Sequence, residues 1–321
     1  MTIRTILGCI DTDMHAVDKL IRESLHSDVV LIRQVAEYII RNGGKRLRPA
    51  LVLLAARACG YQGQMHHSLA TIVEFIHTAT LLHDDVVDES EMRRGKATAN
   101  SLFGNAASVL VGDFLYSRAF QMIVAAGEVK VMEVLAETTN IIAEGEVLQL
   151  LNCHDADLDE SRYLQVIQYK TAKLFSASAR LGAIAAGTLQ YEQALSDYGT
   201  YLGVAFQLVD DALDYSGESE KTGKNVGDDL AEGKPTFPLL HAIRNGTPEE
   251  VTVIKRTIET GGLDGLPAVL AAIERTGAIK RTIAEAHIHA KRATDTILNL
   301  PDSTFKDSLL QLAEFAVIRQ H

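Results

Sequence analysis

The stretch "DYGTYLGVAFQLVDDALDY" (Asp197 to Tyr215) combines the two features on which the interpretation of this sequence depends. Its apolar residues recur at the spacing of one helical face, and it contains the DDxxD motif of Asp210, Asp211 and Asp214. The same apolar period runs through "EVKVMEVLAETTNIIAEGEVLQLL" (Glu128 to Leu151), and no convincing alternating β pattern is present. We therefore predict an all-α protein.

Breaks rich in glycine and polar residues divide the chain into roughly ten or more expected helices. They fall at "RNGGKRLRP", "ACGYQGQ", "LFGNAAS", "NCHDADLDES", "SGESEKTGKNVGDDLAEGKP" and "RNGTPEE". The chain shows neither a low-complexity linker nor a repeat of fixed period. We expect one domain over residues 1–321, a bundle of the kind in which facing helices build a site.

Composition limits the classes of function. With 47% hydrophobic residues the chain can bury a large core, and its net charge of −11 argues against nucleic acid as a partner. It has no stretch of about 18 uncharged apolar residues, and Asp11 and Asp13 interrupt any signal-peptide core, so we expect a cytoplasmic protein. Cys9, Cys59 and Cys153 lie far apart and form no CxxC pair, and we expect them to be buried thiols.

The DDxxD motif occurs twice, because "DDVVD" (Asp84 to Asp88) matches "DDALD" (Asp210 to Asp214). On a helix, the first and last aspartate of each motif share a face. Two unit charges about 4 Å apart repel by roughly 4 kcal/mol at an effective dielectric of 20, so a cation is expected between them. Oxygen-only ligands favour Mg²⁺. A solvated acidic face is the alternative, but the flanking "FIHTATLLH" and "GVAFQLV" are too apolar for a surface stretch.

Basic residues recur beside these motifs. In "GGKRLRP", Lys45 and Arg48 stand three apart where a helix containing Pro49 in its first turn is expected to begin. Other basic residues follow or precede the motifs, namely Arg93, Arg94, Lys96, Lys170, Lys173, Lys224 and Lys234. Each alone reads as a surface charge, but together they suggest a diphosphate held by Mg²⁺ on one side and by basic side chains on the other.

Four segments carry a resemblance to a known family, namely "GGKRLRP", "EFIHTATLLHDDVVDESEMRRGKATAN", "YKTAKLF" and "FQLVDDALDYSGESEKTGKNVGDDLAEGKPTFPLL". They are similar to segments of the trans-isoprenyl diphosphate synthases, and the similarity covers nearly the whole chain. The resemblance implies antiparallel helices around a deep central cavity, the isoprenoid synthase fold, usually as a homodimer.

The resemblance also implies roles for individual residues. Asp84, Asp88 and Asp210 would coordinate Mg²⁺ with Asp214 in support, whereas Asp85 and Asp211 are less certain ligands. Isopentenyl diphosphate would bind at the positions of Lys45, Arg48, His77 and Arg94. The allylic diphosphate would bind at the positions of Arg93, Lys170, Thr171, Gln207, Lys224 and Lys234, and we count Lys170 with the aspartates as catalytic. A buried, hydrogen-bonded histidine is the alternative for His77.

The implied reaction is electrostatic. Departure of diphosphate leaves an allylic cation, which isopentenyl diphosphate attacks, and loss of a proton completes one trans isoprene unit. Ala79 and Thr80, which precede the first motif, are small and would leave the tunnel open to a long product. Octaprenyl is our expectation, and heptaprenyl to decaprenyl stay open. Such a product would serve as a quinone side chain and would need transient membrane contact without stable insertion. Candidates for the tunnel floor are Met122, Ile123, Met132 and Leu135.

Four other classes of protein fit less well. An HD-type phosphohydrolase would use His83 and Asp84 but leaves the second motif unexplained. A di-iron bundle needs two ExxH units, and only Glu74 to His77 supplies one. A non-catalytic partner subunit of a prenyl synthase should have lost a motif, and a terpene cyclase would carry a different second metal motif.

Overall fold

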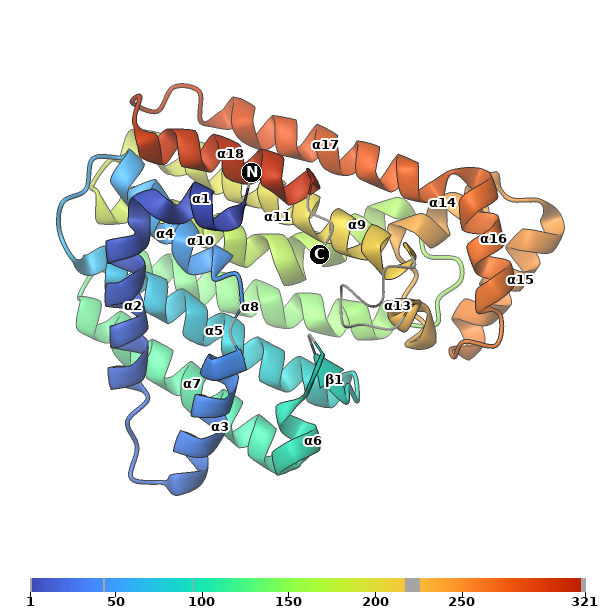
Figure 1. Cartoon of the computed structure of the whole chain (residues 1–321), viewed down its shortest axis with the longest axis horizontal. Helices are drawn as coiled ribbons and strands as arrows, with labels where there is room; N and C mark the ends of the chain where they lie inside the picture. The colour runs from blue at the N-terminus through green and yellow to red at the C-terminus, as the bar shows by residue number, and fades with distance from the viewer. Residues whose placement is uncertain (1, 43, 94, 217–225, 319–321) are drawn as a thin grey trace. The chain divides into compact units, whose positions relative to one another are not determined.

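The computed structural model describes residues 2–42, 44–93, 95–216 and 226–318, and nearly all regular structure in them is helical (Figure 1). The α-helices are α1 (Ile3–Leu7), α2 (Asp11–Ser24), α3 (Val30–Asn42), α4 (Leu47–Ala58), α5 (Met65–Val87), α6 (Ala99–Phe103), α7 (Asn105–Ala126), α8 (Val129–Asn152), α9 (Glu160–Ile167), α10 (Lys173–Ala185), α11 (Glu192–Asp214), α13 (Asp228–Ala231), α14 (Phe237–Asn245), α15 (Pro248–Thr260), α16 (Leu266–Thr276), α17 (Ala278–Thr296) and α18 (Thr304–Ile318). Short 3-10 or π segments are η1 (Gly8–Ile10), η2 (Gln168–Ala172) and η3 (Leu189–Tyr191). The all-α prediction is confirmed.

The expected breaks separate the helices where glycine and proline predict them. The segment "ACGYQGQ" separates α4 from α5, and Gly104 alone separates α6 from α7. Pro49 lies in the first turn of α4, where its missing N–H removes no helical hydrogen bond. The only strands in the described residues are β1 (Met92–Arg93) and β2 (Lys96–Ala97), an antiparallel pair that the apolar pattern did not predict.

The chain divides into two compact units of discontinuous sequence. Unit 1 contains residues 1–139, 174–199 and 294–315, and unit 2 contains residues 140–173, 200–293 and 316–321. Helices α8, α10, α11, α17 and α18 contribute residues to both. The single domain and the deep cavity stay predictions.

The core of unit 1 is built on α4, whose residues from Ala50 to Ala56 are all completely buried. Helix α10 packs closely on it at Gly182, where an added Cβ would lie 2.5 Å from the Cβ of Ala55. Because that distance is far below van der Waals contact, glycine is required at this crossing. Helices α4 and α10 are thereby fixed against each other.

Two apolar clusters are found among the described residues of unit 2. One surrounds the second half of α11, with Val204, Leu208 and Val209 packed against Tyr163 of α9 and Phe237 of α14. The other joins α14, α15 and α16 through buried side chains such as Leu239, Ile254, Ile258, Val269 and Ile273. The first cluster is close-packed and excludes water, and it holds the part of α11 that precedes the second aspartate motif.

The cysteines do not follow the expectation of buried thiols. Cys9 is exposed, Cys59 and Cys153 are half-buried, and all three are free. Cys9 belongs to the 3-10 turn η1, in which Ile10 and not Cys9 faces the core, and its Sγ lies 3.2 Å from Ser308 Oγ.

Helix α7 is long and apolar enough to cross a membrane by length and composition alone. Only 28% of its most apolar 18-residue window is buried, and Val109, Leu110 and Val124 are exposed on it. No other described helix passes the same test. An exposed apolar surface of this kind is typical of a site that contacts another protein or a membrane.

Glu192 carries a testable contribution to stability in unit 1. At the start of α11 its buried carboxylate accepts hydrogen bonds from Lys130 of α8 and from Arg180 Nε at 2.8 Å. Burial alone would raise the pKa of Glu192, but these two cations outweigh it and hold the pKa below the ordinary 4.5. The carboxylate therefore stabilises the fold above about pH 4.5, and this contribution is lost as the pH falls and protonates it.

We expect Glu192→Gln to lower the free energy of unfolding by about 1–2 kcal/mol at neutral pH, because the two cations lose their charged partner. Urea denaturation near pH 7 and near pH 4 measures this difference, which should shrink at the acidic value. Glu259→Gln, a change of an exposed carboxylate on α15, is the control and should have little effect. A destabilisation that does not depend on pH would show that shape, not charge, matters at Glu192.

Candidate active site

The first aspartate motif ends α5. Asp84 and Asp85 lie in its last turn, and Asp88 is the C-cap residue, whose N–H donates to the carbonyl of Asp84 at 2.8 Å. Asp84 and Asp88 are both half-buried. The C-terminus of a helix carries a partial negative charge, so carboxylates there are unfavourable unless cations compensate them. The motif therefore stands where an added cation is most stabilising.

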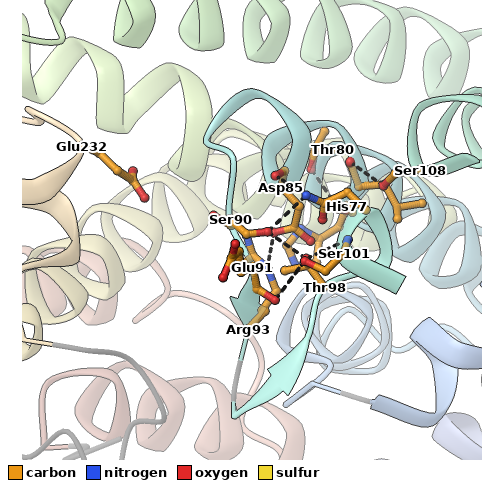
Figure 2. A network of polar contacts seen from close by, with 12 residues as sticks. His77, Thr80, Asp85, Ser90, Glu91, Arg93, Thr98, Ser101, Ser108 and Glu232 are labelled. Atoms are coloured by element: carbon orange, nitrogen blue, oxygen red, sulfur yellow. Dashed lines mark hydrogen bonds and ion pairs between the residues drawn. The ribbon is translucent and has the colours of Figure 1, made fainter. Parts of the chain in front are cut away.

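Asp85 differs from its neighbours because it already has a cation. Figure 2 shows its carboxylate beside Arg93, whose Nε and Nη2 both lie 2.8 Å from Asp85 Oδ1. Asp85 is only 5% exposed, whereas the Arg93 side chain is 34% exposed, so the carboxylate is buried and the guanidinium still reaches solvent. Asp85 thus holds Arg93 in place, and its Oδ1 is already engaged by two guanidinium nitrogens.

The same network fixes the β1–β2 hairpin that follows the motif (Figure 2). Thr98 Oγ1 donates to the carbonyl of Ser90 at 2.7 Å and also accepts from Ser101 N to cap α6. The amide of Asn100 donates to the carbonyls of Asp85 and Ser90, both at 3.1 Å. The carbonyls of Asp85 and Ser90 at the end of α5 thereby gain donors, and Arg93 is carried on a defined hairpin.

The basic N-terminal segment lies beside the middle of α5. Arg48 Nη1 lies 3.1 Å from His77 Nε2, and because guanidinium only donates, the histidine nitrogen accepts. The Arg48 guanidinium also lies 4.4 Å from the ring centre of Phe175, and Lys45 lies 5.8 Å from that of Phe315. Three of the four residues expected to bind isopentenyl diphosphate are therefore found in unit 1. Arg48 and His77 are in direct contact.

Arg46 is a residue of this segment that sequence reasoning missed. It has a left-handed backbone with φ of 51° at the N-cap of α4, and its side chain donates to Glu74 of α5 at 2.7 Å. A non-glycine residue at positive φ is strained and persists only where its surroundings hold it. The Arg46–Glu74 ion pair holds Arg46 in this conformation. Lys45 and Arg48 flank Arg46 in the sequence.

The second motif ends α11 in unit 2. Asp210 is half-buried, Asp211 is 2% exposed and Asp214 is 8% exposed. Asp214 receives the backbone N–H of Asp229 at 3.3 Å, which ties α11 to the start of α13. The motif thus repeats the first one, with carboxylates concentrated at the negative end of a long helix.

Asp211 is held by neutral donors. Tyr163 of α9 donates its hydroxyl to Asp211 Oδ2, and Gln207 Nε2 donates to Oδ1 at 2.8 Å. Burial, and after it the charges of Asp229 and Asp210, raise the pKa of Asp211 to about 7. The second motif therefore concentrates more negative charge than its protein donors balance. Tyr163 was also missed from the sequence, because nothing in its local pattern marks it.

The expected ligands of the allylic diphosphate in unit 2 are partly connected to this motif. Thr171 donates to Gln207 Oε1 at 3.0 Å, and Lys170 donates to Glu146 of α8 at 2.6 Å. Both Lys170 and Thr171 lie in the π-helical segment η2, an irregularity that is frequent at functional sites. Lys234 forms an ion pair with Glu232. Glu146 is a further residue that the sequence did not indicate.

Two expected ligands, Arg94 and Lys224, lie outside the described residues. Of the chain-length candidates, Ala79 is completely buried, and Thr80 donates to the carbonyl of His77 at 2.8 Å. One turn after Ala79, His83 lies against Gly112 of α7, where an added Cβ would be 2.4 Å from its Nε2. Helix geometry therefore turns the side of α5 that bears Ala79 toward α7.

We expect Tyr163→Phe to lower turnover by about tenfold, because Asp211 loses the donor that fixes its orientation beside Asp210. The cost in stability should be about 1–3 kcal/mol, since a buried carboxylate oxygen loses a partner. Steady-state kinetics and urea denaturation measure the two effects. Tyr191→Phe, at a half-exposed position in η3, serves as the control and should change neither. Wild-type turnover in a destabilised Tyr163→Phe would assign the tyrosine to packing alone.

The chain is similar in sequence to proteins of a known family. Residues 29–270 match the family model described as polyprenyl synthetase. The chain is 55% identical to the octaprenyl diphosphate synthase of Escherichia coli (strain K12) over 309 residues, 96% of each protein.

The chain is also similar in fold to solved structures of such proteins. A polyprenyl synthase from Caulobacter crescentus CB15, complexed with calcium and isoprenyl diphosphate, superposes with a TM-score of 0.96 at 44% identity, over 100% of this chain and 98% of that one. A decaprenyl diphosphate synthase from Rhodobacter capsulatus gives a TM-score of 0.94 at 45% identity, with complete coverage of both chains. A fold of this kind is thus found in solved polyprenyl synthases.

Proposed function

Because the chain belongs to the polyprenyl synthetase family, we propose that it condenses isopentenyl diphosphate onto an allylic diphosphate such as farnesyl diphosphate to make a long all-trans product, octaprenyl diphosphate. The observation that carries this proposal is the pair of DDxxD motifs, each at the C-terminal end of a 23-residue helix. Both motifs are intact, which supports a catalytic chain over a non-catalytic partner subunit.

We propose Mg²⁺ as the cofactor, coordinated by Asp84, Asp88 and Asp210, with Asp214 in support. The donors fit this ion because they are carboxylate oxygens at helix ends that already carry partial negative charge. Bound there with the substrate, the metal would stabilise charge on the departing diphosphate. Asp85 and Asp211 would orient their neighbours, since each is already engaged by Arg93 or by Tyr163 and Gln207.

The basic residues divide into two groups. Lys45, Arg48 and His77 would hold isopentenyl diphosphate, with Arg94 expected beside them from the sequence. The allylic diphosphate would be held at Arg93, Lys170, Thr171, Gln207 and Lys234, with Lys224 expected there as well. Arg93 supports this role because guanidinium has five N–H donors, and Asp85 engages only two of its nitrogens.

The side chains would act mainly by positioning and charge. Arg48 and Lys45 would fix the diphosphate of isopentenyl diphosphate so that its double bond faces the allylic carbon. Lys170 would stabilise the diphosphate as it leaves. The released diphosphate would take the proton that the new product loses, so no protein nucleophile is required.

Arg48→Ala should separate the two substrates. We expect a rise of about tenfold or more in the Michaelis constant for isopentenyl diphosphate, with little change for the allylic substrate, because a charge-assisted contact to one diphosphate is lost. Lys224→Ala should have the reverse effect. Initial rates with each substrate varied in turn measure both. Equal effects on the two substrates would contradict the assignment of the pockets.

We propose a homodimer in the cytoplasm that associates through α7. The exposed Val109, Leu110 and Val124 support an apolar interface, whereas Asp113 and Arg118 on the same helix disfavour insertion into a bilayer. The polyprenyl product would supply a quinone side chain and require only transient membrane contact. Sedimentation velocity with Leu110→Glu tests the interface: a dimer that persists in this variant contradicts it.

The function itself is tested by incubating purified protein with isopentenyl diphosphate, farnesyl diphosphate and Mg²⁺ and analysing the dephosphorylated products by chromatography. We expect octaprenol as the main product. Heptaprenol to decaprenol would correct the product length only, and a cyclised hydrocarbon would contradict the proposed reaction.

A further inference from the structure

A cluster of four titratable side chains lies in unit 1 at the far end of α5 from the aspartate motif. It contains Asp13 from the first turn of α2, Arg57 from the last turn of α4, and His66 and His67 from the first turn of α5. His66 precedes Asp84 by 18 residues, which on a helix corresponds to about 27 Å. The cluster is therefore separate from the residues assigned to the prenyl substrates.

The two imidazoles converge on one carboxylate oxygen. Nε2 of His67 lies 2.8 Å from Asp13 Oδ1, and Nε2 of His66 lies 3.4 Å from the same atom. The two rings lie beside each other, with centroids 4.1 Å apart and planes tilted by 30°. One ligand atom from each of the three residues lies within 4.8 Å of the others.

His66 lacks a hydrogen bond in this arrangement. Its side chain is completely buried, and neither ring nitrogen has a hydrogen-bond partner among the described residues. His67 can donate to Asp13 Oδ1 with acceptable geometry, but His66 Nε2 cannot. A buried polar nitrogen without a partner destabilises the folded state, so such a residue requires an explanation.

We propose that Asp13, His66 and His67 bind a divalent transition-metal ion of the zinc class. Two imidazole nitrogens and one carboxylate oxygen are a donor set that suits Zn²⁺ and not Mg²⁺, which prefers oxygen. Ligand atoms around a tetrahedral Zn²⁺ stand about 3.4 Å apart at the usual bond lengths. The separations of 2.8 and 3.4 Å from Asp13 Oδ1 to the two nitrogens are close to this, so small side-chain rotations complete the site.

Arg57 takes part as a neighbour that orients the carboxylate. Its Nε donates to Asp13 Oδ2 at 2.8 Å and its Nη2 donates to Oδ1 at 2.6 Å. A carboxylate offers about four lone-pair positions, so these two bonds leave room for the metal on Oδ1. The positive charge of Arg57 weakens the attraction for a second cation, and we expect moderate affinity.

Binding requires a change of tautomer but no net proton transfer. His67 now donates from Nε2, and its proton must move to Nδ1 through solvent before Nε2 can coordinate. The His67 side chain is 18% exposed, which gives access for the ion and a place for a water ligand. Once bound, the metal would join α2 to α5 and stabilise the folded state by mass action.

The test uses the full chain without an affinity tag, stripped of metal with a chelator and then dialysed against Zn²⁺ in excess Mg²⁺. The Mg²⁺ occupies the aspartate motifs, so retained zinc reports other sites. We expect about one Zn²⁺ per chain, affinity at least about tenfold weaker in His67→Gln, and unchanged binding in His287→Gln, which alters an exposed histidine on α17. Asp84→Asn should also bind zinc normally.

Two readouts keep the proposal falsifiable if His67→Gln folds poorly. Co²⁺ bound to the wild type should give the intense visible absorption of a four-coordinate nitrogen and oxygen site, and Zn²⁺ should displace it. Zinc should also raise the melting temperature of the wild type and of His287→Gln. Absence of retained zinc in the wild type, or equal zinc affinity in His67→Gln and the wild type, would overturn the proposal.

Discussion

Replacement of Asp84 by asparagine is expected to reduce turnover by about 10²–10³-fold while the protein remains folded. The change keeps the shape of the side chain but removes one negative charge from a metal ligand. Because Asp84 lies at the C-terminal end of α5, where negative charge is unfavourable, loss of its charge should not lower the free energy of unfolding. Asp210→Asn at the end of α11 should behave in the same way.

Initial rates with saturating substrates and Mg²⁺, together with urea denaturation, measure this prediction. Asp264→Asn, a change of an exposed aspartate in the loop before α16, is the matched control and should keep wild-type turnover. Near-wild-type rates in Asp84→Asn or Asp210→Asn would contradict the role of the two motifs. A strong loss of stability would instead indicate that the carboxylate is part of the packing.

Replacement of Ala79 by tyrosine is expected to shorten the product to about fifteen to twenty carbons, because a packed wall cannot absorb the added ring without strain. The ring should then turn into the space where the chain grows, and elongation should stop after few additions. Ala79 is completely buried, so the side chain cannot escape to solvent. This would be about half the length of the wild-type product.

Chromatography of the dephosphorylated products decides the outcome. The competing possibility is that the tyrosine packs against α7, since His83, one turn after Ala79, lies against Gly112 of that helix. In that case the substitution would lower the free energy of unfolding by roughly 1–3 kcal/mol and leave the product length unchanged. Ala284→Tyr, on an exposed part of α17, is the control and should alter neither property. A long product from a destabilised Ala79→Tyr would show that the position serves packing and that chain length is set elsewhere.

The helices could be predicted because their signals are local. The apolar period of Asp197 to Tyr215 and the glycine-rich break between α4 and α5 each depend on neighbouring residues only. The break that begins at Ser216 also predicts the end of α11 at the second DDxxD motif, whereas no expected break marks the end of α5 at the first motif. The pairing of Arg48 with His77 could not be predicted in this way, because their contact joins two helices. Family resemblance assigned both residues to one substrate but predicted no contact between them.

The supporting residues could not be predicted, because they act through tertiary contacts. Tyr163 bonds Asp211 from 48 residues away, and Arg46 bonds Glu74 from 28 residues away. Nothing in a local pattern distinguishes such a tyrosine or arginine from others. The ion pair of Asp85 with Arg93 spans only eight residues, but it depends on the hairpin of β1 and β2, whose two-residue strands carry no periodic signal.

The central claim is that both aspartate motifs hold the diphosphate of one allylic substrate through Mg²⁺. A crystal structure with Mg²⁺ and an unreactive thio analogue of farnesyl diphosphate tests this most directly. The account predicts Mg²⁺ coordinated by Asp84 and Asp88 and Mg²⁺ coordinated by Asp210, with the diphosphate of the analogue bound to the metal. A diphosphate bound with metal at only one motif, with the other aspartates in contact with protein alone, would contradict it.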